Sequence, residues 1–222
     1  MESVSRQLRI DQQIYIEYFD ENTLIVYRAI EVLNDDYIKG FTGFDPHPHN
    51  DMEIITYVVS GELTHKDSMG NERTLSSGGV QYMSAGTGVI HSEYNNKEEE
   101  LHLYQIWIYP NQKGRTPNYG DMMFDPSERE NTFLHIVSNH DKDGKIFINQ
   151  EADIFVGEFD KGKEVEINLD GHDYIYIVLI EGEFETKDYI VETQDSIETS
   201  ENLSIKMLEK SHLLVLKVNE YR

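Results

Sequence analysis

Three observations predict that this chain is an all-β protein with two domains in tandem. Short apolar or alternating stretches recur along the 222 residues, and turn-forming residues separate them. Aromatic residues make up 11% of the chain and include 14 tyrosines, which suit the half-buried surface of a sheet. No segment keeps a helical period over its length, so we expect at most a short helical turn at residues 127–130.

The expected strands are distributed over the whole chain. Each is a short run rich in β-branched, aromatic or other apolar residues, and turn signals lie on either side of it. We expect strands at residues 13–19, 23–32, 53–59, 101–109, 132–138, 153–159, 174–180 and 212–218. Strands of this length and spacing, without helices between them, are typical of β-barrels and sandwiches.

The connection at residues 111–131 is the least regular part of the chain. Helix- and strand-breaking residues in or beside it are Pro110, Gly114, Pro117, Gly120 and Pro126. We place the domain junction there, with an N-terminal domain of residues 1–125 and a C-terminal domain of residues 126–222. A short internal repeat favours duplication of one β-barrel, because residues 56–63 (TYVVSGEL) and 176–184 (YIVLIEGEF) both carry Gly-Glu after an apolar strand.

The charge of the chain restricts its partners. There are 19 basic and 42 acidic residues, a formal net charge of −23 at pH 7. The resulting field repels phosphate backbones and anionic membranes, so we expect no direct nucleic-acid partner and no membrane partner. The N-terminal residues lack the apolar core of a signal peptide, and no run of about 18 apolar residues occurs. We expect a cytoplasmic protein, and a monomer in the absence of a contrary signal.

Two histidine-containing pairs have the spacing of metal ligands. The chain has no cysteine, so any metal ion must be bound by nitrogen and oxygen. Side chains two residues apart on a strand point to the same face, so His47 and His49 share one direction, and so do His91 and Glu93. Two such pairs facing each other would bind Fe(II), Mn(II), Zn(II), Co(II), Ni(II) or Cu(II) and leave positions open for a substrate. Glu53 is a competing candidate for the carboxylate ligand.

The sequence around both pairs resembles the cupin superfamily. GFDPHPHNDMEIITYVVSG (residues 43–61) is similar to the first cupin motif, and GVIHSEYN (residues 88–95) is similar to the second. Gly86 stands where many cupins have proline. Within the superfamily the match narrows to the pirin family, which HPHNDMEIITYVVSGELTHKDSMGN, MSAGTGVIHSEYN and LHLYQIWIYP resemble closely. The resemblance is dense over residues 30–125 and thins afterwards.

The resemblance implies two tandem cupin domains, which are double-stranded β-helix or jelly-roll β-barrels, with a metal site only in the first. Its ligands would be His47, His49, His91 and Glu93, which leaves Glu53 outside the coordination sphere. The implied activity is that of a quercetin 2,3-dioxygenase, which opens the heterocycle of a flavonol with O₂ and releases CO. The implied cofactor is one divalent transition metal, with Fe(II) first among the candidates. Glu93 would serve as ligand and as the base that takes the flavonol proton.

The sequence leaves one other function open and disfavours a second. Pirin-family members also include redox-sensing proteins, so a metal-dependent regulatory or binding protein that acts through protein partners is the alternative. A cupin-type sugar-phosphate isomerase is disfavoured, because no cluster of Lys and Arg accompanies the ligand pairs to hold a phosphate. The remaining histidines have no partner at ligand spacing and are expected to be structural, although His65 and Gln105 could line the pocket.

Overall fold

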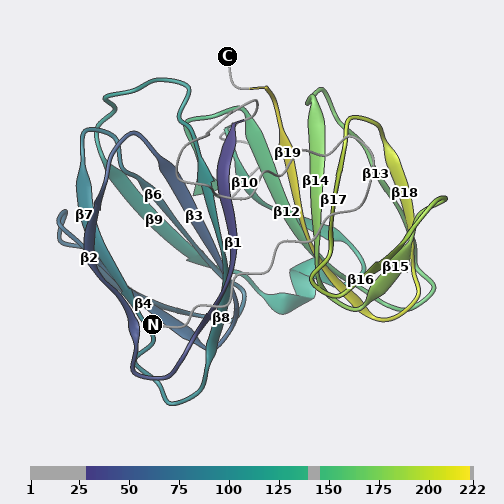
Figure 1. The fold of residues 1–222 in the computed structure, drawn as a ribbon, viewed down its shortest axis with the longest axis horizontal. Helices are drawn as coiled ribbons and strands as arrows, with labels where there is room; N and C mark the ends of the chain where they lie inside the picture. The colour runs from purple at the N-terminus through teal and green to yellow at the C-terminus, as the bar shows by residue number, and fades with distance from the viewer. Residues whose placement is uncertain (1–28, 140–145, 221–222) are drawn as a thin grey trace, which may run out of the picture. The chain divides into compact units, whose positions relative to one another are not determined.

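The computed structural model describes residues 29–139 and 146–220, and strands dominate both segments (Figure 1). The described residues contain no α-helix and one short 3-10 helix, η1 (Pro126–Arg129), close to the expected helical turn. The prediction of an all-β protein is confirmed. The expected strand at residues 13–19, and most of the one at residues 23–32, lie outside the described residues. No helix in the described part of the chain is long and apolar enough to cross a membrane.

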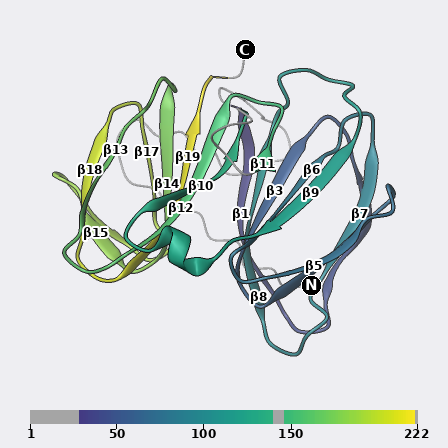
Figure 2. The same ribbon diagram turned by 180° about the vertical axis from the view of Figure 1, so that it is seen from behind.

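Contacts divide the described residues into two compact units. The first contains residues 30–126 and 146–150, and the second contains residues 29, 127–139 and 151–220. Each unit has the two facing sheets of a cupin-type domain, as expected for a tandem arrangement (Figure 2). Residues 146–150, which include β11 (Ile146–Phe147), return to the first unit, and the sequence pattern gave no sign of that. The predicted limits at residues 125 and 126 stay a prediction.

The first unit consists of a five-stranded sheet and a four-stranded sheet. Their strand orders are β1-β8-β3-β6-β9 and β2-β7-β4-β5, and every adjacent pair is antiparallel. The strands are β1 (Ile30–Ile38), β2 (Gly43–His49), β3 (Glu53–Ser60), β4 (Glu62–Asp67), β5 (Glu72–Ser76), β6 (Gly79–Ser84), β7 (Val89–Tyr94), β8 (Leu101–Ile108) and β9 (Asn118–Met123).

The interior of the first unit has two apolar regions with polar side chains between them. Alternate residues of β3 show this order, since Ile54 belongs to one apolar cluster, Val58 belongs to the other, and Thr56 lies between them. Thr56 is the cross-strand partner of Gln81 on β6 and of Gln105 on β8. Three neighbouring strands therefore carry a polar row across the middle of the apolar core.

Strand β9 corrects the expectation that residues 111–131 form no regular ladder. It pairs with β6 over its full length, from Asn118 opposite Ser84 to Met123 opposite Gly79. The breakers do not prevent this, because Pro117 lies just before the strand and β9 is the edge of its sheet. Gly120 is accommodated there as well, and a Cβ added to it would have no atom within 4 Å.

The second unit has the same two-sheet plan. One sheet contains strands in the order β10-β12-β19-β14-β17 and the other in the order β13-β18-β15-β16. Their inner faces meet in a core that includes Phe159, Ile177, Phe184 and Leu213. The strands expected at residues 132–138, 153–159, 174–180 and 212–218 are confirmed. The strands are β10 (Phe133–Ser138), β12 (Ala152–Phe159), β13 (Glu164–Ile167), β14 (Tyr174–Glu181), β15 (Glu183–Glu185), β16 (Ile190–Glu192), β17 (Ser196–Thr199), β18 (Leu203–Met207) and β19 (Ser211–Val218).

Candidate metal centre

Three of the four predicted ligands meet on neighbouring strands of the first unit. His47 and His49 lie on β2, and His91 lies on β7 as the cross-strand partner of His47. One ring nitrogen from each histidine can be chosen so that all three lie within 4.8 Å of one another. The ring centroids are 4.4 to 4.9 Å apart. The structure thus brings three imidazoles to the end of an antiparallel pair.

The local sequence explains why β2 can hold this position. Pro46 and Pro48 have no backbone N–H, and β2 is an edge strand, where a missing donor is tolerated. A register shift between Phe44 and His47 changes the pairing just before the first ligand. Gly43 lies so close to β7 that a Cβ there would stand 2.2 Å from the carbonyl oxygen of Glu93. The glycine therefore allows β2 to approach β7 closely beside the histidines.

The ring nitrogens of these histidines are suited to bind a cation. His47 Nδ1 donates to the backbone oxygen of Asp45 at 2.8 Å, so its Nε2 carries a lone pair. His49 Nε2 and both ring nitrogens of His91 are buried and have no hydrogen-bond partner. Burial and neighbouring histidines lower the pKa of His49 to about 4 and that of His91 to about 3. Both rings are therefore neutral at ordinary pH, which is the form that binds metals.

Glu93 is completely buried and belongs to a second, overlapping group of donors. One carboxylate oxygen of Glu93 and one ring nitrogen each from His65 and His91 lie within 4.8 Å of one another. The Glu93 carboxylate accepts hydrogen bonds from Gln81 Nε2 at 2.5 Å and from Gln105 Nε2 at 2.7 Å. Burial raises the pKa of Glu93 to about 7, while the two amides act in the opposite direction. The four predicted ligands are thus divided between two groups that share His91.

The competing carboxylate, Glu53, belongs to neither group of donors. It lies on β3 and accepts hydrogen bonds from Tyr82 Oη and Ser84 Oγ, both at 2.6 Å. The backbone and side-chain nitrogens of Asn149 also donate to it, at 3.0 and 3.1 Å. Glu53 and Thr56 are three residues apart on one strand, so Glu53 points to the face opposite the polar row of the interior. Its lone pairs are occupied by the protein itself.

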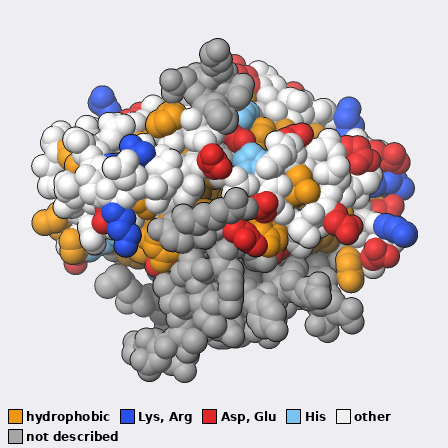
Figure 3. Space-filling view, turned by 90° about the horizontal axis from the view of Figure 1, so that it is seen from above, with side chains coloured by type: hydrophobic (Ala, Val, Ile, Leu, Met, Phe, Trp, Pro, Cys, Tyr) orange, Lys and Arg blue, Asp and Glu red, His pale blue; other side chains and the backbone are white. Residues whose placement is uncertain are grey.

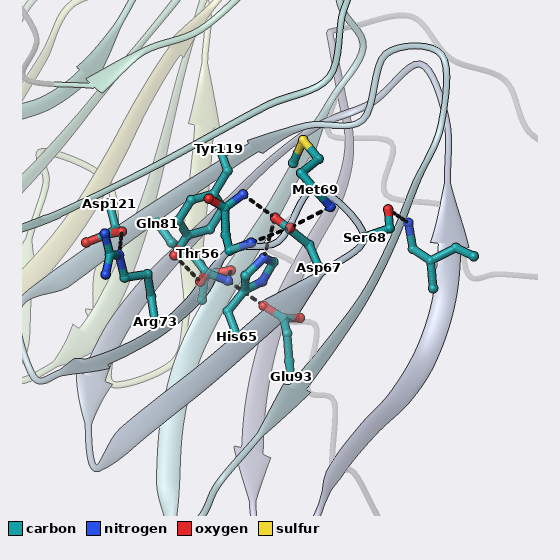
Figure 4. Close-up of polar contacts among 12 residues, drawn as sticks. Thr56, His65, Asp67, Ser68, Met69, Arg73, Gln81, Glu93, Tyr119 and Asp121 are labelled. Carbon is teal, nitrogen blue, oxygen red and sulfur yellow. Dashed lines mark hydrogen bonds and ion pairs between the residues drawn. The ribbon is translucent and has the colours of Figure 1, made fainter.

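His65 lies closer to the candidate ligands than its spacing in the sequence predicted. It is fully buried on β4, and Figure 4 shows it between Asp67 and Glu93. Its Nε2 lies 3.2 Å from Asp67 Oδ2, its Nδ1 has no partner, and the Tyr119 ring stacks on it at 4.6 Å. Burial is the main cause that lowers the pKa of His65. The His-x-Asp spacing on one strand was the available signal, because it places both side chains on one face.

Other described histidines form hydrogen bonds to carboxylates away from these donors. His102 on β8 lies 2.6 Å from Asp35, and in the second unit His135 lies 2.8 Å from Asp153. Hydrogen bonding to His135 helps to keep the pKa of Asp153 low in spite of burial. These pairs fit the expected structural role. His140 lies outside the described residues.

Family models match both halves of the chain. The Pirin model matches residues 3–108, and the model described as Quercetinase C-terminal cupin domain matches residues 135–218. A protein named Quercetin 2,3-dioxygenase from Escherichia coli K12 is 36% identical over 184 residues, which cover 82% of this chain and 78% of that protein. A Pirin-like protein from Caulobacter vibrioides is 34% identical over 205 residues, covering 91% and 88%.

Solved structures show the same fold. The crystal structure of YhhW from Escherichia coli has a TM-score of 0.83 at 34% identity and covers 94% of this chain and 88% of its own. A second crystal structure, described as bacterial pirin YhhW in complex with nickel(II), has a TM-score of 0.82 at 32% identity, covering 94% and 90%. These similarities extend over both units of the chain.

Proposed function

The chain belongs to the pirin family of the cupin superfamily, and from that premise we propose that it is a metal-dependent dioxygenase of the quercetin 2,3-dioxygenase type. One observation carries the proposal. Buried, unpartnered imidazole nitrogens of His49 and His91 converge with His47 inside a cupin-type unit, beside a buried carboxylate. The proposed substrates are a small aromatic molecule of the flavonol type and O₂, with opening of the heterocycle and release of CO.

The residues fit a divalent transition metal. Unpartnered nitrogens in a buried position are costly unless a cation or another group binds them, and neutral imidazole is a suitable ligand for these ions. We assign His47, His49, His91 and Glu93 as the ligands and Fe(II) as the ion, and the same donors also suit Mn, Co, Ni, Cu and Zn. When bound, the ion supplies a Lewis acid for a phenolic hydroxyl and a redox partner for O₂.

The side chains around Glu93 prepare it to accept a proton. Burial raises the pKa of Glu93 to about 7 in the metal-free protein, and a bound cation would lower it, so Glu93 would be a carboxylate able to accept a proton. The amides of Gln81 and Gln105 hold both carboxylate oxygens in place. Trp107 Nε1 donates to Gln105 Oε1 at 2.9 Å, so the position of one of these amides is itself fixed. Glu93 would take the proton of the flavonol hydroxyl.

CO release from metal-reconstituted protein tests the proposal. Quercetin would be supplied to protein loaded in turn with Fe, Mn, Co, Ni or Cu, and CO and the ring-opened product would be measured. We expect turnover with at least one metal, and its loss in His91→Ala and Glu93→Gln. His135→Gln, a change in the second unit, is the matched control and should keep full activity. Inactivity with all five metals, or full activity in His91→Ala, would contradict the proposal.

A second candidate is a metal-dependent regulatory protein that acts through protein partners. The observation in its favour is that His91, which both donor groups share, and Glu93 are each only 2% exposed, so these two donors are shielded from solvent. Under this alternative, metal binding would change the protein's association with a partner and no flavonol would be consumed. The CO measurement therefore separates the two candidates.

A further inference from the structure

We propose that His65, oriented by Asp67, is a positioning residue for the metal ligand His91. His65 Nδ1 has no partner in the structure, and with the ion bound it would accept a hydrogen bond from the His91 ring nitrogen that does not bind the ion. The inference rests on the proposed metal centre, and it does not depend on the dioxygenase activity.

Asp67 is held firmly enough to orient a neighbouring ring. Its Oδ1 accepts the backbone N–H groups of Met69 and Asn71 at 2.9 and 3.0 Å, and its Oδ2 accepts Asn71 Nδ2 at 2.8 Å. Three N–H donors on the two carboxyl oxygens favour the charged form of Asp67. Asp67 is therefore a carboxylate and acts only as an acceptor.

The tautomer of His65 follows from that carboxylate. His65 Nε2 faces Asp67 Oδ2 at 3.2 Å, so the proton of the neutral ring must lie on Nε2. Nδ1 then carries the lone pair, and this atom is buried without a partner. Tyr119 stacks on the ring at an interplanar angle of 18° and restricts its rotation. The structure thus presents a fixed, unused hydrogen-bond acceptor.

His91 has no hydrogen-bond acceptor for either of its ring nitrogens, and His65 has an unused acceptor atom, Nδ1. A metal-binding histidine almost always donates its second ring nitrogen to an acceptor, which fixes the ring and strengthens it as a ligand. His47 has such an acceptor in the backbone oxygen of Asp45, whereas both ring nitrogens of His91 are unpartnered. The His65 and His91 rings have centroids 5.4 Å apart, and Asp67 is the cross-strand partner of His91. An unused acceptor and an unused donor therefore lie side by side.

Metal affinity and the visible spectrum of bound Co(II) test this role. Affinity would be measured by competition with a chromophoric chelator for the wild type, His65→Leu and His65→Gln. We expect His65→Leu to bind Co(II) about 10- to 100-fold more weakly, which is the usual effect of losing such a partner. Its Co(II) absorption bands should also shift, because His91 would be reoriented. His65→Gln should recover part of the affinity, since its amide oxygen can accept the same hydrogen bond.

His102→Leu is the matched control, because His102 is also a buried histidine paired with an aspartate in the same unit. We expect this variant to lose stability in the metal-free state while its Co(II) affinity and spectrum stay unchanged. Wild-type affinity and spectrum in His65→Leu would overturn the inference, and so would failure of the wild type to bind Co(II). Weaker binding in His65→Leu would support it even if no CO is released, so the two proposals can fail separately.

Discussion

Two buried glutamates, Glu53 and Glu93, show how neighbours decide the role of a residue type. Both are carboxylates on strands of the first unit, and the sequence spacing left both open as the carboxylate ligand. Glu53 accepts four hydrogen bonds from Tyr82, Ser84 and Asn149, whereas Glu93 accepts hydrogen bonds from Gln81 and Gln105 and lies in a group with His65 and His91. The surroundings of Glu53 therefore favour a structural role and those of Glu93 favour a functional one.

Glu53→Gln is expected to destabilise the protein and leave its metal affinity unchanged. The amide would place an N–H₂ group against donors that now share a carboxylate, at a cost of about 2 kcal/mol. Urea unfolding of the metal-free protein would measure the loss, and chelator competition would measure the affinity. Glu93→Gln is the paired variant, for which the affinity should fall. A large loss of affinity in Glu53→Gln would return Glu53 to the list of ligands.

Asp36 is expected to make stability depend on pH. Burial, and then the neighbouring Asp35, raises its pKa in the folded protein to about 6. A raised carboxyl pKa contributes stability that is fully present below the unfolded value, about pH 4, and is lost as the pH rises through 6. Asp36→Asn should therefore stabilise the protein by about 1–3 kcal/mol at pH 8, and the gain should disappear near pH 4. Urea midpoints at both pH values measure it, and an equal effect at both would contradict the assignment.

The histidine pairs were predictable and the role of His65 was not, for a physical reason. Alternation along a strand depends only on spacing, so the sequence alone showed that His47 and His49 share a face. The use of His65 depends on its tautomer, which Asp67 decides through a hydrogen bond that no sequence pattern reveals.

The structure also explains why Gly86 stands where many cupins have proline. Its φ is +44°, and a Cβ there would lie 2.1 Å from the Arg115 oxygen. Proline, with φ near −65°, cannot take this place.

Strands β2 and β7 form the element on which the metal centre depends, and their close approach requires Gly43. Gly43→Ala would place a Cβ 2.2 Å from the Glu93 oxygen and 2.6 Å from Tyr94 Cα, so β2 would have to move. We expect a loss of at least about 2 kcal/mol in stability, together with weaker metal binding, because His47 and His49 would move with the strand. Unfolding and chelator competition measure the two effects.

Gly120→Ala on β9 is the control for this prediction. Gly120 also lies in a strand of the first unit, but nothing lies within 4 Å of a Cβ built there. We expect little change in stability or in metal affinity. If Gly43→Ala behaved like Gly120→Ala, the close approach of β2 and β7 would not be needed for the site.

Strand β9 shows why some elements could not be predicted from the pattern. Strands in the interior of a sheet are recognisable in the sequence by continuous apolar or alternating residues, as in Glu53–Ser60 and Leu101–Ile108. Asn118–Met123 (NYGDMM) has few such residues, because an edge strand buries little of its own surface. Its pairing comes from the free edge of β6, which is a property of the folded sheet. With it the sequence reasoning also missed Tyr119, the ring that stacks on His65.

At the scale of the whole molecule, the net charge and the metal centre favour the same kind of ligand. A charge of −23 raises the local concentration of cations and repels anions. On the face shown in Figure 3, acidic side chains gather over the second unit, with a few basic ones among them. The negative electrostatic potential is therefore not confined to the unit that has the donor groups. It should speed the arrival of a metal cation, whereas the histidines and Glu93 provide the specific binding.

Metal binding is expected to stabilise the first unit selectively. Both donor groups lie in residues 47–93, and the second unit has a separate apolar core built around residues such as Phe184 and Leu213. A ligand that binds only the folded state stabilises it by about 2.7 kcal/mol at a free concentration of 100 times Kd. Backbone amides of β2 and β7 should therefore exchange with deuterium up to about 100-fold more slowly when Co(II) is present.

Amides of β14 and β19 in the second unit serve as the internal reference and should exchange at unchanged rates. Hydrogen–deuterium exchange with mass spectrometry, with and without Co(II), provides both readings in one experiment. His91→Ala should abolish the protection of β2 and β7, because His91 belongs to both donor groups. Equal protection of the two units would mean that they unfold as one cooperative body. Protection confined to β14 and β19 would place the metal in the second unit and contradict the assignment of the ligands.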